Sequence, residues 1–519
     1  MNALADAVPK FDIPTIEYAA LAPILIVLGA AVVSVLVEAL LPQRYRRTSQ
    51  LVIVFVALVA AFAAVIAARG TQKIVAMGSV AIDGPTLFMQ GSILVLAAIA
   101  ALVMAERKVD PAGDSFAPRA SALPGSEDEQ IFTRLGWLQT EVWPLFLFCV
   151  GGMLLFPAST DLLTMFVALE VLSLPLYVMV GLARRRRLLS QEASLKYFVL
   201  GAFSSAFFLY GTALLYGYAG TVSLSGIADA LTNSAGDTGL VLAGVGLLAV
   251  GLLFKIGAAP FHQWTPDVYQ GAPTSITGFM AACTKVAAFG ALFRVLYVAL
   301  GGIRWDWRPM MYVIAALTMI VGTLFALTQT DIKRMLAYSS IAQAGFMLVG
   351  VVALSSEGLE GTLVYLVAYG IATVGAFAIV TLVRDATGEA THLSQWAGLG
   401  KRSPVVAAAF ALFLLAFAGI PLTSGFTGKF AVFTAGIQGG ATPIVVIGVV
   451  ASAVAAFFYI RVIVLMFFNE PQAEGGPSVV IPSAFTTLAI TVAVALTVVI
   501  GVLPQLVFTL VSQAGTFVR

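Results

Sequence analysis

The sequence predicts an all-α, polytopic membrane protein with about fourteen transmembrane helices. Of its 519 residues, 60% are hydrophobic and only 10% are charged, whereas an average soluble domain has about 25% charged residues. Apolar runs of roughly twenty residues, each long enough to cross a bilayer, recur along the chain. A few lysine, arginine and glutamate residues lie inside these runs. Because a charge inside a bilayer is unfavourable, such residues usually mark an ion or proton route.

The predicted helices fall into sections separated by one long polar segment. Residues 1–105 carry three helices, and residues 106–140 are predicted to form a polar cytoplasmic loop rich in proline and acidic residues. Residues 141–300 carry helices 4–8, residues 301–470 carry helices 9–13, and residues 471–519 carry the last helix. In chain order, the predicted helices span 17–41, 49–68, 86–105, 141–157, 160–182, 193–219, 239–259, 275–300, 309–328, 336–355, 360–383, 404–436, 442–468 and 482–511.

The seventh and twelfth predicted helices are interrupted, and each interruption lies close to a lysine. A glycine and a proline follow Lys255, and a glycine and a proline precede Lys429. Proline removes a helical hydrogen bond, and broken helices in matching positions line the sites of transporters built from inverted repeats. Because the two helices are five apart in order, they cross in opposite directions. This spacing predicts an inverted repeat of helices 4–8 and 9–13.

The lysine and arginine residues between the helices predict the orientation of the chain. With the N-terminus outside, sixteen of the 28 basic residues fall in inner segments and six in outer segments, so both termini are predicted to lie outside. The inner set includes Lys333 and the run Arg184–Arg187, which either anchors the topology or binds anionic lipid. The three leading helices and the richness in Ala, Val and Gly favour a bacterial plasma (inner) membrane.

Motifs that bind cofactors are missing from the sequence. Cys149 and Cys283 lie in separate apolar runs without a CxxC motif, and His262 and His392 are the only histidines. Iron–sulfur clusters, structural zinc and paired haem ligands need more of these residues at fixed spacings. There is no Walker A motif, and the one GxGxxA match follows no predicted strand. We therefore expect no nucleotide, flavin or metal to bind this chain.

Several charged residues lie inside the predicted helices. Arg294 and Arg461 lie near helix ends, where a long side chain can reach the interface, so structural roles are expected. Lys196 lies a few residues into its run, which is typical of an interfacial anchor. Glu170 and Lys255 either form a static buried ion pair or take part in proton transfer. The whole set is Glu170, Lys196, Lys255, Lys285, Arg294, Lys429 and Arg461.

Lysine suits proton transfer because burial destabilises its charged form, whereas arginine stays protonated in proteins. A carboxylate has the opposite effect, since a unit pair at about 4 Å gains about 4 kcal/mol at an effective dielectric constant of about 20. Moving Glu170 away from Lys255 would therefore turn a lysine that holds its proton into a proton donor.

The residues around the first interruption resemble a known family. The string Trp264-Thr-Pro-Asp-Val-Tyr-Gln-Gly271 is similar to the seventh-helix region of subunit N of bacterial NADH-quinone oxidoreductase, respiratory complex I. The resemblance continues at Glu192–Tyr197, Thr330–Ile341 and Ala418–Phe430, and it covers most of the chain from helix 4 to helix 14. The sister subunits L and M, and the multisubunit sodium/proton antiporters, typically read Leu-Pro-Asp-Ala at the corresponding place.

The resemblance implies a proton-translocating subunit in the membrane arm of the complex. It implies that Glu170 controls Lys255, and that Lys285 connects this pair to Lys429, which exchanges protons with the outer side. Lys196 would be the sixth-helix lysine of subunit N. The NADH, FMN, iron–sulfur and quinone chemistry would belong to other subunits, and subunits M, K and J would be the neighbours. The chain would then serve a translocase without redox chemistry of its own.

Two features depart from the family pattern, and two other functions stay open. Gln343 stands where some relatives have histidine, so it is not expected to titrate, although a glutamine can order water. The 106–140 segment is longer than expected. The alternative functions are a subunit of a multisubunit sodium/proton antiporter and a non-conducting scaffold whose buried charges only fix helix packing.

Overall fold

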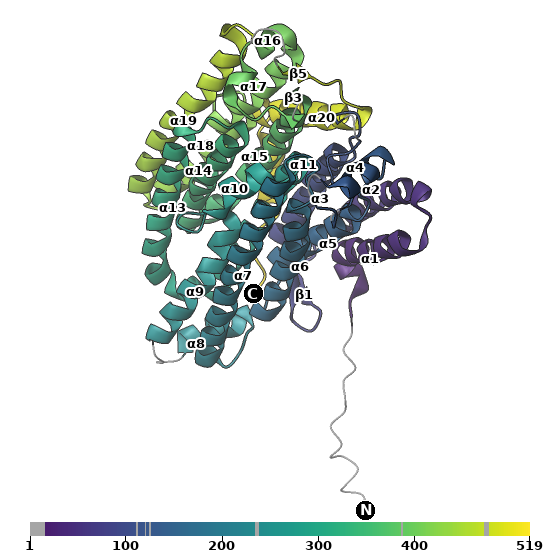
Figure 1. Ribbon diagram of the computed structural model, residues 1–519. Helices are drawn as coiled ribbons and strands as arrows, with labels where there is room; N and C mark the ends of the chain where they lie inside the picture. Colours follow the sequence, from purple (N-terminus) through teal and green to yellow (C-terminus); the bar gives the residue numbers. More distant parts are fainter. Residues whose placement is uncertain are drawn as a thin grey trace, which may run out of the picture.

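The structure, a computed structural model, is a bundle of long apolar helices (Figure 1). It describes residues 16–110, 113–119, 121–123, 126–233, 238–385, 388–471 and 477–519. Among these residues, twelve helices are long and apolar enough to cross a membrane, and the apolar helices Val142–Ala158 and Pro404–Ala418 are shorter. The all-α membrane fold is therefore confirmed, whereas the count of about fourteen spans stays a prediction, as does the division into sections.

All the predicted helical runs are helical in the structure. The first part of the chain forms α1 (Tyr18–Leu40), α2 (Gln43–Ala67), α3 (Gly84–Met104), α4 (Glu127–Arg134), α5 (Val142–Leu155), η2 (Phe156–Ala158), α6 (Leu162–Val180), α7 (Arg187–Ala219) and α8 (Leu224–Asn233). The middle part forms α9 (Thr238–Ile256), α10 (Trp264–Gly271), α11 (Thr274–Phe279), η3 (Met280–Thr284), α12 (Lys285–Arg294), η4 (Val295–Ala299), η5 (Gly301–Ile303), α13 (Arg304–Thr328), α14 (Ile332–Val352) and α15 (Ser356–Leu382). The last part forms η6 (Leu393–Trp396), α16 (Leu399–Arg402), α17 (Pro404–Ala418), α18 (Ser424–Gln438), α19 (Thr442–Phe468), α20 (Ala484–Val502) and α21 (Gln505–Ser512).

The structure differs from the predicted elements in several places, among them the short helices α8, α10 and α16, which lie between predicted spans. The last predicted helix is two helices, α20 and α21, and the polar 106–140 segment contains the short helix α4. Two small antiparallel sheets were not predicted, because strands of two or three residues are too short to give a sequence period. They pair β1 (Lys73–Val75) with β2 (Val80–Ile82), and β3 (Val383–Asp385) with both β4 (Gly388–Glu389) and β5 (Ser478–Val479).

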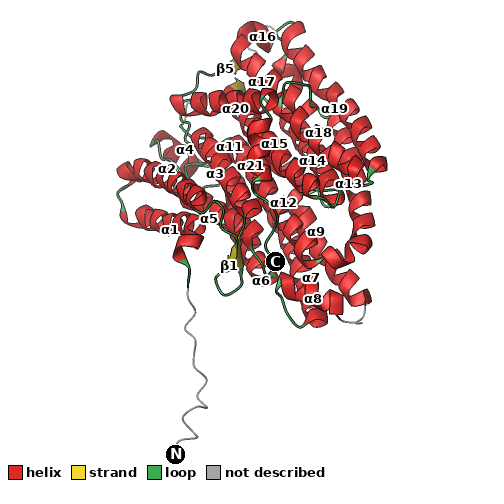
Figure 2. Ribbon diagram, turned by 180° about the vertical axis from the view of Figure 1, so that it is seen from behind, coloured by secondary structure: helices red, strands yellow, loops and turns green. Residues whose placement is uncertain are grey.

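Three helical stretches form the centre of the bundle. The most apolar window is completely buried in Thr274–Ala299 and 94% buried in both α14 and α15, against 28% in α20. Figure 2 shows α12, α14 and α15 between α3 on one side and α13 on the other. Because protein rather than lipid surrounds these stretches, they can carry polar side chains at membrane depth.

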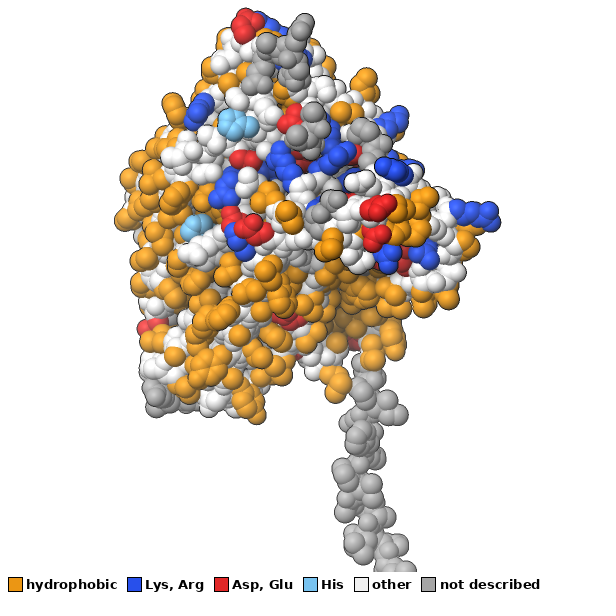
Figure 3. Space-filling model, in the orientation of Figure 1, with side chains coloured by type: hydrophobic (Ala, Val, Ile, Leu, Met, Phe, Trp, Pro, Cys, Tyr) orange, Lys and Arg blue, Asp and Glu red, His pale blue; other side chains and the backbone are white. Residues whose placement is uncertain are grey.

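Charged side chains gather in one band of the surface. Figure 3 shows them across the upper part of the molecule, above a surface dominated by apolar side chains. The basic run Arg184–Arg187, at the start of α7, binds carboxylates of the polar 106–140 segment. Arg185 is 3.0 Å from Asp110, and Arg187 is 2.9 Å from Glu129. The hydrogen bonds to Asp110 raise the pKa of Arg185 above its ordinary value. The run thus ties the polar segment to α7.

Candidate functional site

The first predicted interruption lies between α9 and α10. Gly257 has a φ of +79°, and its N–H donates to the carbonyl oxygens of Leu253 and Phe254, which ends α9. Pro260 has no N–H with which to continue a helix, and α10 begins four residues later. The glycine allows the left-handed backbone conformation that this turn requires. Lys255 therefore lies in the last turn of α9, directly before the break.

The Lys255 ammonium is buried between two hydroxyl groups and two aromatic rings. Its Nζ atom donates to the Ser173 hydroxyl at 2.8 Å and to the Tyr197 hydroxyl at 3.1 Å. It also lies 5.3 Å from the ring centroid of Tyr197 and 5.8 Å from that of Tyr177. Trp264, the first residue of α10, stacks on Tyr197 with centroids 4.6 Å apart. Trp264 thus links the start of α10, just after the helix break, to the aromatic ring that contacts Lys255.

Glu170 lies one turn before Ser173 on α6. Its Oε1 atom is buried without a hydrogen-bond partner, and in the described part of the chain no ion pair within 4.0 Å joins it to Lys255. The structure thus contains no direct ion pair between Glu170 and Lys255, and the hydroxyl groups of Ser173 and Tyr197 are the hydrogen-bond partners of the ammonium. Glu170 lies three residues before one of these partners, Ser173, on the same helix.

Lys285 connects the first broken helix to the centre of the bundle. It is the first residue of α12 and directly follows the π-helical turn η3, a widened turn that often occurs at functional sites. Its Nζ atom donates to the carbonyl oxygen of Ile256 at 2.8 Å. Since Ile256 is the last residue of α9 and follows Lys255, the end of this helix links the two lysines.

The second predicted interruption repeats this arrangement between α17 and α18. Gly419 ends α17 with a φ of +80°, and a Cβ atom there would lie 2.8 Å from Cδ of Lys429. The Lys429 ammonium donates to the carbonyl oxygens of Phe417 and Ala418 at 2.9 and 3.0 Å, and to the Ser452 hydroxyl at 2.9 Å. Glycine is required here because any side chain would displace the lysine. Both breaks thus present helix-terminal carbonyl groups to a buried lysine.

The negative end of each broken helix explains why its lysine can be buried. The last carbonyl groups of a helix have no partner within the helix, and the helix dipole places partial negative charge there. Lys285 donates a hydrogen bond to such a carbonyl group at the end of α9, and Lys429 does so at the end of α17. A neutral lysine amine would lose the charge-assisted part of these bonds. Each lysine is thus held by backbone carbonyl groups at a helix end, and no carboxylate of the described residues is among its hydrogen-bond partners.

Gln343 lies beside the second site. Its amide donates to the Phe417 carbonyl at 2.8 Å and to the Tyr459 hydroxyl at 3.2 Å, and its oxygen accepts from the Tyr365 hydroxyl. The Phe417 oxygen is the one that also accepts from Lys429. Gln343 thus orients the polar groups around this lysine without titrating itself.

Lys196 lies apart from the other predicted lysines. Its side chain is 43% exposed and pairs with Glu192 and Asp267, each at 2.7 Å. The next residue, Tyr197, faces inward and contacts Lys255, so Lys196 points away from that site. Asp267 also binds Arg334 at 2.6 Å. These contacts agree with an anchor at the surface, and they do not test a role in proton transfer.

Two basic residues differ from their predicted surroundings. Arg294 was expected to reach the interface, but it is completely buried and binds Asp83 at 2.8 Å. Lys333, predicted in an inner loop, is the second residue of α14, and only 3% of its side chain is exposed. It donates to the Ala272 carbonyl at 2.9 Å. Hydropathy could not show that Lys333 belongs to a helix, because the start of this helix is marked by its N-cap residue, Asp331, and not by apolar residues.

Comparison with known proteins places the chain in a family. Residues 159–455 match the family described as "NADH:quinone oxidoreductase/Mrp antiporter, TM". NADH-quinone oxidoreductase subunit N of Rhodococcus opacus is 62% identical, with 98% of this chain and 97% of the relative covered. Subunit N 3 of Streptomyces griseus is 60% identical, with 98% and 96% covered.

Solved structures agree with these relatives. A chain of respiratory complex I from Thermus thermophilus with bound aureothin has a TM-score of 0.76 and 32% identity, and covers 94% of this chain and 98% of its own. A chain of the Mrp complex from Dietzia sp. has a TM-score of 0.79 at 22% identity, with 95% and 97% covered, and therefore shares the fold. The chain is 62% and 60% identical to the two subunit N relatives but 22% identical to the Mrp chain. It therefore belongs to the subunit N family of NADH-quinone oxidoreductase.

Proposed function

We propose that this chain carries protons across the membrane through Glu170, Lys255, Lys285 and Lys429. As a member of the subunit N family, it is a membrane-arm, proton-translocating subunit of NADH-quinone oxidoreductase, complex I. The observation that supports the route most strongly is the repeated geometry of the two broken helices. The end of α9 offers one carbonyl group to the buried Lys285, and the end of α17 offers two to the buried Lys429.

The proposed cycle begins at Glu170. When this carboxylate approaches Lys255, a pair at about 4 Å gains about 4 kcal/mol and keeps the proton on the lysine. When the carboxylate withdraws, Ser173 and Tyr197 alone hold the ammonium, and the proton moves on to Lys285. Redox energy from the rest of the complex shifts this pair between its two states.

The second half of the route runs from Lys285 to Lys429. We infer that water and polar side chains carry the proton between them, with Gln343 ordering the groups next to Lys429. Lys429 then releases the proton toward the outer side. We include Lys196 in the proposal because of the family resemblance. It lies on α7 near the surface and pairs with Asp267 of α10.

The remaining parts of the proposal concern the complex as a whole. We infer that FMN, the iron–sulfur clusters and quinone bind to other subunits, so that this chain contributes to a translocase without redox chemistry of its own. Its proposed neighbours are the antiporter-like subunit M and the small subunits K and J. The proposed location is a bacterial plasma membrane, with both termini on the outer side.

Replacing Glu170 tests the switch separately from assembly. In the assembled complex, Glu170→Gln should lower NADH-driven proton pumping by roughly tenfold or more, because even a third of a pair energy of about 4 kcal/mol changes a proton equilibrium about tenfold. Assembly is measured by the amount of purified complex, and pumping by acidification of the vesicle interior. Glu357→Gln, at an exposed carboxylate near the start of α15, is the control. Normal pumping by an assembled Glu170→Gln complex would favour the scaffold function instead.

A further inference from the structure

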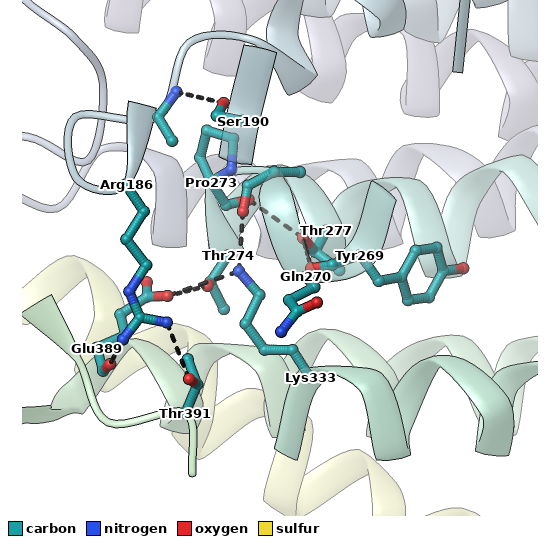
Figure 4. Close-up of polar contacts among 12 residues, drawn as sticks. Arg186, Ser190, Tyr269, Gln270, Pro273, Thr274, Thr277, Lys333, Glu389 and Thr391 are labelled. Atoms are coloured by element: carbon teal, nitrogen blue, oxygen red, sulfur yellow. Dashed lines mark hydrogen bonds and ion pairs between the residues drawn. The ribbon is translucent and has the colours of Figure 1, made fainter. Parts of the chain in front are cut away.

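A small cavity opens beside the second half of the first broken helix, in the band of charged side chains. It encloses about 50 Å³, which exceeds the roughly 10–15 Å³ that one water molecule requires. Its lining includes Gln270 of α10, Lys333 of α14 and Glu389 of β4. Figure 4 shows Glu389 beside Thr274 and Lys333, so that three elements distant in sequence meet at this cavity.

Glu389 and Lys333 form a pair that reaches from water into the protein. The Lys333 ammonium lies 3.6 Å from Oε2 of Glu389, whose side chain is 19% exposed, whereas that of Lys333 is 3% exposed. The same carboxylate oxygen accepts from the Thr274 hydroxyl. Lys333 also donates to the Ala272 carbonyl, directly after the end of α10. It therefore repeats the arrangement of Lys285 and Lys429, a buried lysine at the carbonyl end of a helix.

The other charged groups that line the cavity have partners, although Nη1 of Arg184, which pairs through Nη2 with Asp114 at 2.7 Å, makes no hydrogen bond to the described residues. Arg185 and Arg384 both bind Asp110, at 3.0 and 2.7 Å. Arg186 donates to the backbone oxygen of Glu389 at 3.3 Å. These contacts use most of the arginine groups that an anionic ligand would need, so a proton-exchanging pair explains the cavity better than an anion site. The charged groups that line the cavity with Glu389 are Asp110, Arg184, Arg185, Arg186, Lys333 and Arg384, and Asp331 acts on Lys333 from the start of α14.

A polar stripe on α14 leads from this pair to the second lysine site. Lys333, Ser340 and Gln343 are spaced by seven and three residues, which places them on one face of the helix. The Tyr269 hydroxyl lies 3.4 Å from that of Ser340, and Gln343 shares a carbonyl partner with Lys429. The longest step, seven residues or about 10 Å along the helix, is short enough for a chain of a few waters.

We propose that Glu389 and Lys333 form the inlet through which protons from the inner side enter the polar interior. This inference rests on the proposed function and adds a place of proton uptake for the second half of the route, which ends at Lys429. A proton from the cavity water binds to a carboxylate oxygen of Glu389. Lys333 then releases its own proton to water on the side that faces the protein interior. The carboxyl proton then moves to the Lys333 amine. One proton has thus entered from the cavity, one has passed on into the protein interior, and both side chains regain their charges.

Glu389→Gln in the whole complex tests the inlet. In inverted membrane vesicles the inner face meets the medium, so NADH-driven turnover and pumping can be followed from about pH 6 to about pH 9. Without a collecting carboxylate, uptake depends directly on proton concentration, and turnover should fall by up to about tenfold per pH unit above neutrality. Glu389→Asp keeps a carboxylate and should restore most of the parent rate and profile. Glu470→Gln, at a carboxylate paired with Lys401 and 81% exposed, should keep the parent profile.

Three results would overturn the inlet. In the first, Glu389→Gln keeps the parent turnover at every pH. In the second, Glu389→Gln loses the same fraction of turnover at every pH and Glu389→Asp does not restore it. In the third, neither variant assembles. The last two results would mark a carboxylate needed only for structure. Lys255→Ala, measured in the same vesicles, separates this inference from the proposed function. Normal pumping by Lys255→Ala would refute the route itself, whereas impaired Lys255→Ala with parent-like Glu389→Gln would refute only the inlet.

Discussion

Lys255→Ala in the assembled complex should lower NADH-driven proton pumping and coupled turnover by roughly tenfold or more, since a positioned proton-transfer group contributes about 10²–10⁴-fold. Lys255 is 2% exposed, and its ammonium contacts the hydroxyl groups of Ser173 and Tyr197. Alanine leaves both hydroxyl groups in place but removes the group that carries the proton. Pumping by membrane vesicles and NADH oxidation by the same vesicles measure the two effects.

The matched control for this variant is Lys401→Ala. Lys401 lies on α16, has a side chain that is 52% exposed, and pairs with Glu470 at 2.7 Å. Exposed pairs of this kind contribute about 0–1 kcal/mol, so this variant should assemble and pump normally. Equal pumping by Lys255→Ala, Lys401→Ala and the parent complex would refute the role of Lys255.

Arg294→Met should produce a large loss of stability. Arg294 and Asp83 form an ion pair with fully buried side chains, which joins α12 to the start of α3. Removing one partner of such a pair leaves a buried charge without compensation, at a cost of about 3–5 kcal/mol. Asp83 also accepts hydrogen bonds from Thr86 and Val518, so the C-terminal segment should loosen as well. The thermal denaturation midpoint of the purified complex and its yield measure this effect.

Two further variants show whether the buried charge is the cause. Arg461→Met removes an arginine that donates to the Leu327 carbonyl on the surface, at 3.4 Å, and it should leave the midpoint close to the parent value. Asp83→Asn combined with Arg294→Met removes both charges and should recover much of the loss. If Arg294→Met is as stable as Arg461→Met, the ion pair does not support the fold.

Hydropathy and helix breakers were enough to predict the helices and both interruptions, because these features are local in sequence. The lysines at the breaks were found in the same way, since a single charge stands out within an apolar run. Their partners could not be found, because Ser173 is 82 positions from Lys255 and Asp83 is 211 positions from Arg294. The carbonyl groups that hold Lys285 and Lys429 carry no side-chain signal at all.

Other features escaped prediction for physical reasons of their own. The π-helical turn before Lys285 lies inside an apolar run whose hydropathy does not distinguish a π-helical turn from an α-helical one. Lys333 was predicted to lie in a loop because the apolar run gives a helix from residue 336. The helix in the structure begins at Ile332, where polar and apolar residues alternate. Glu389 lies in a two-residue strand, and its meeting with Lys333 is set by the tertiary fold.

The central claim is that Lys255 gives up its proton in each cycle. Lys255→Arg tests it most directly, because arginine keeps the positive charge but does not release a proton in proteins. The measurement is NADH-driven proton pumping by purified complex of confirmed assembly. We expect the Lys255→Arg complex to pump as poorly as the Lys255→Ala complex. Pumping at the parent rate by Lys255→Arg would contradict the claim, because a fixed charge at this position would then be sufficient.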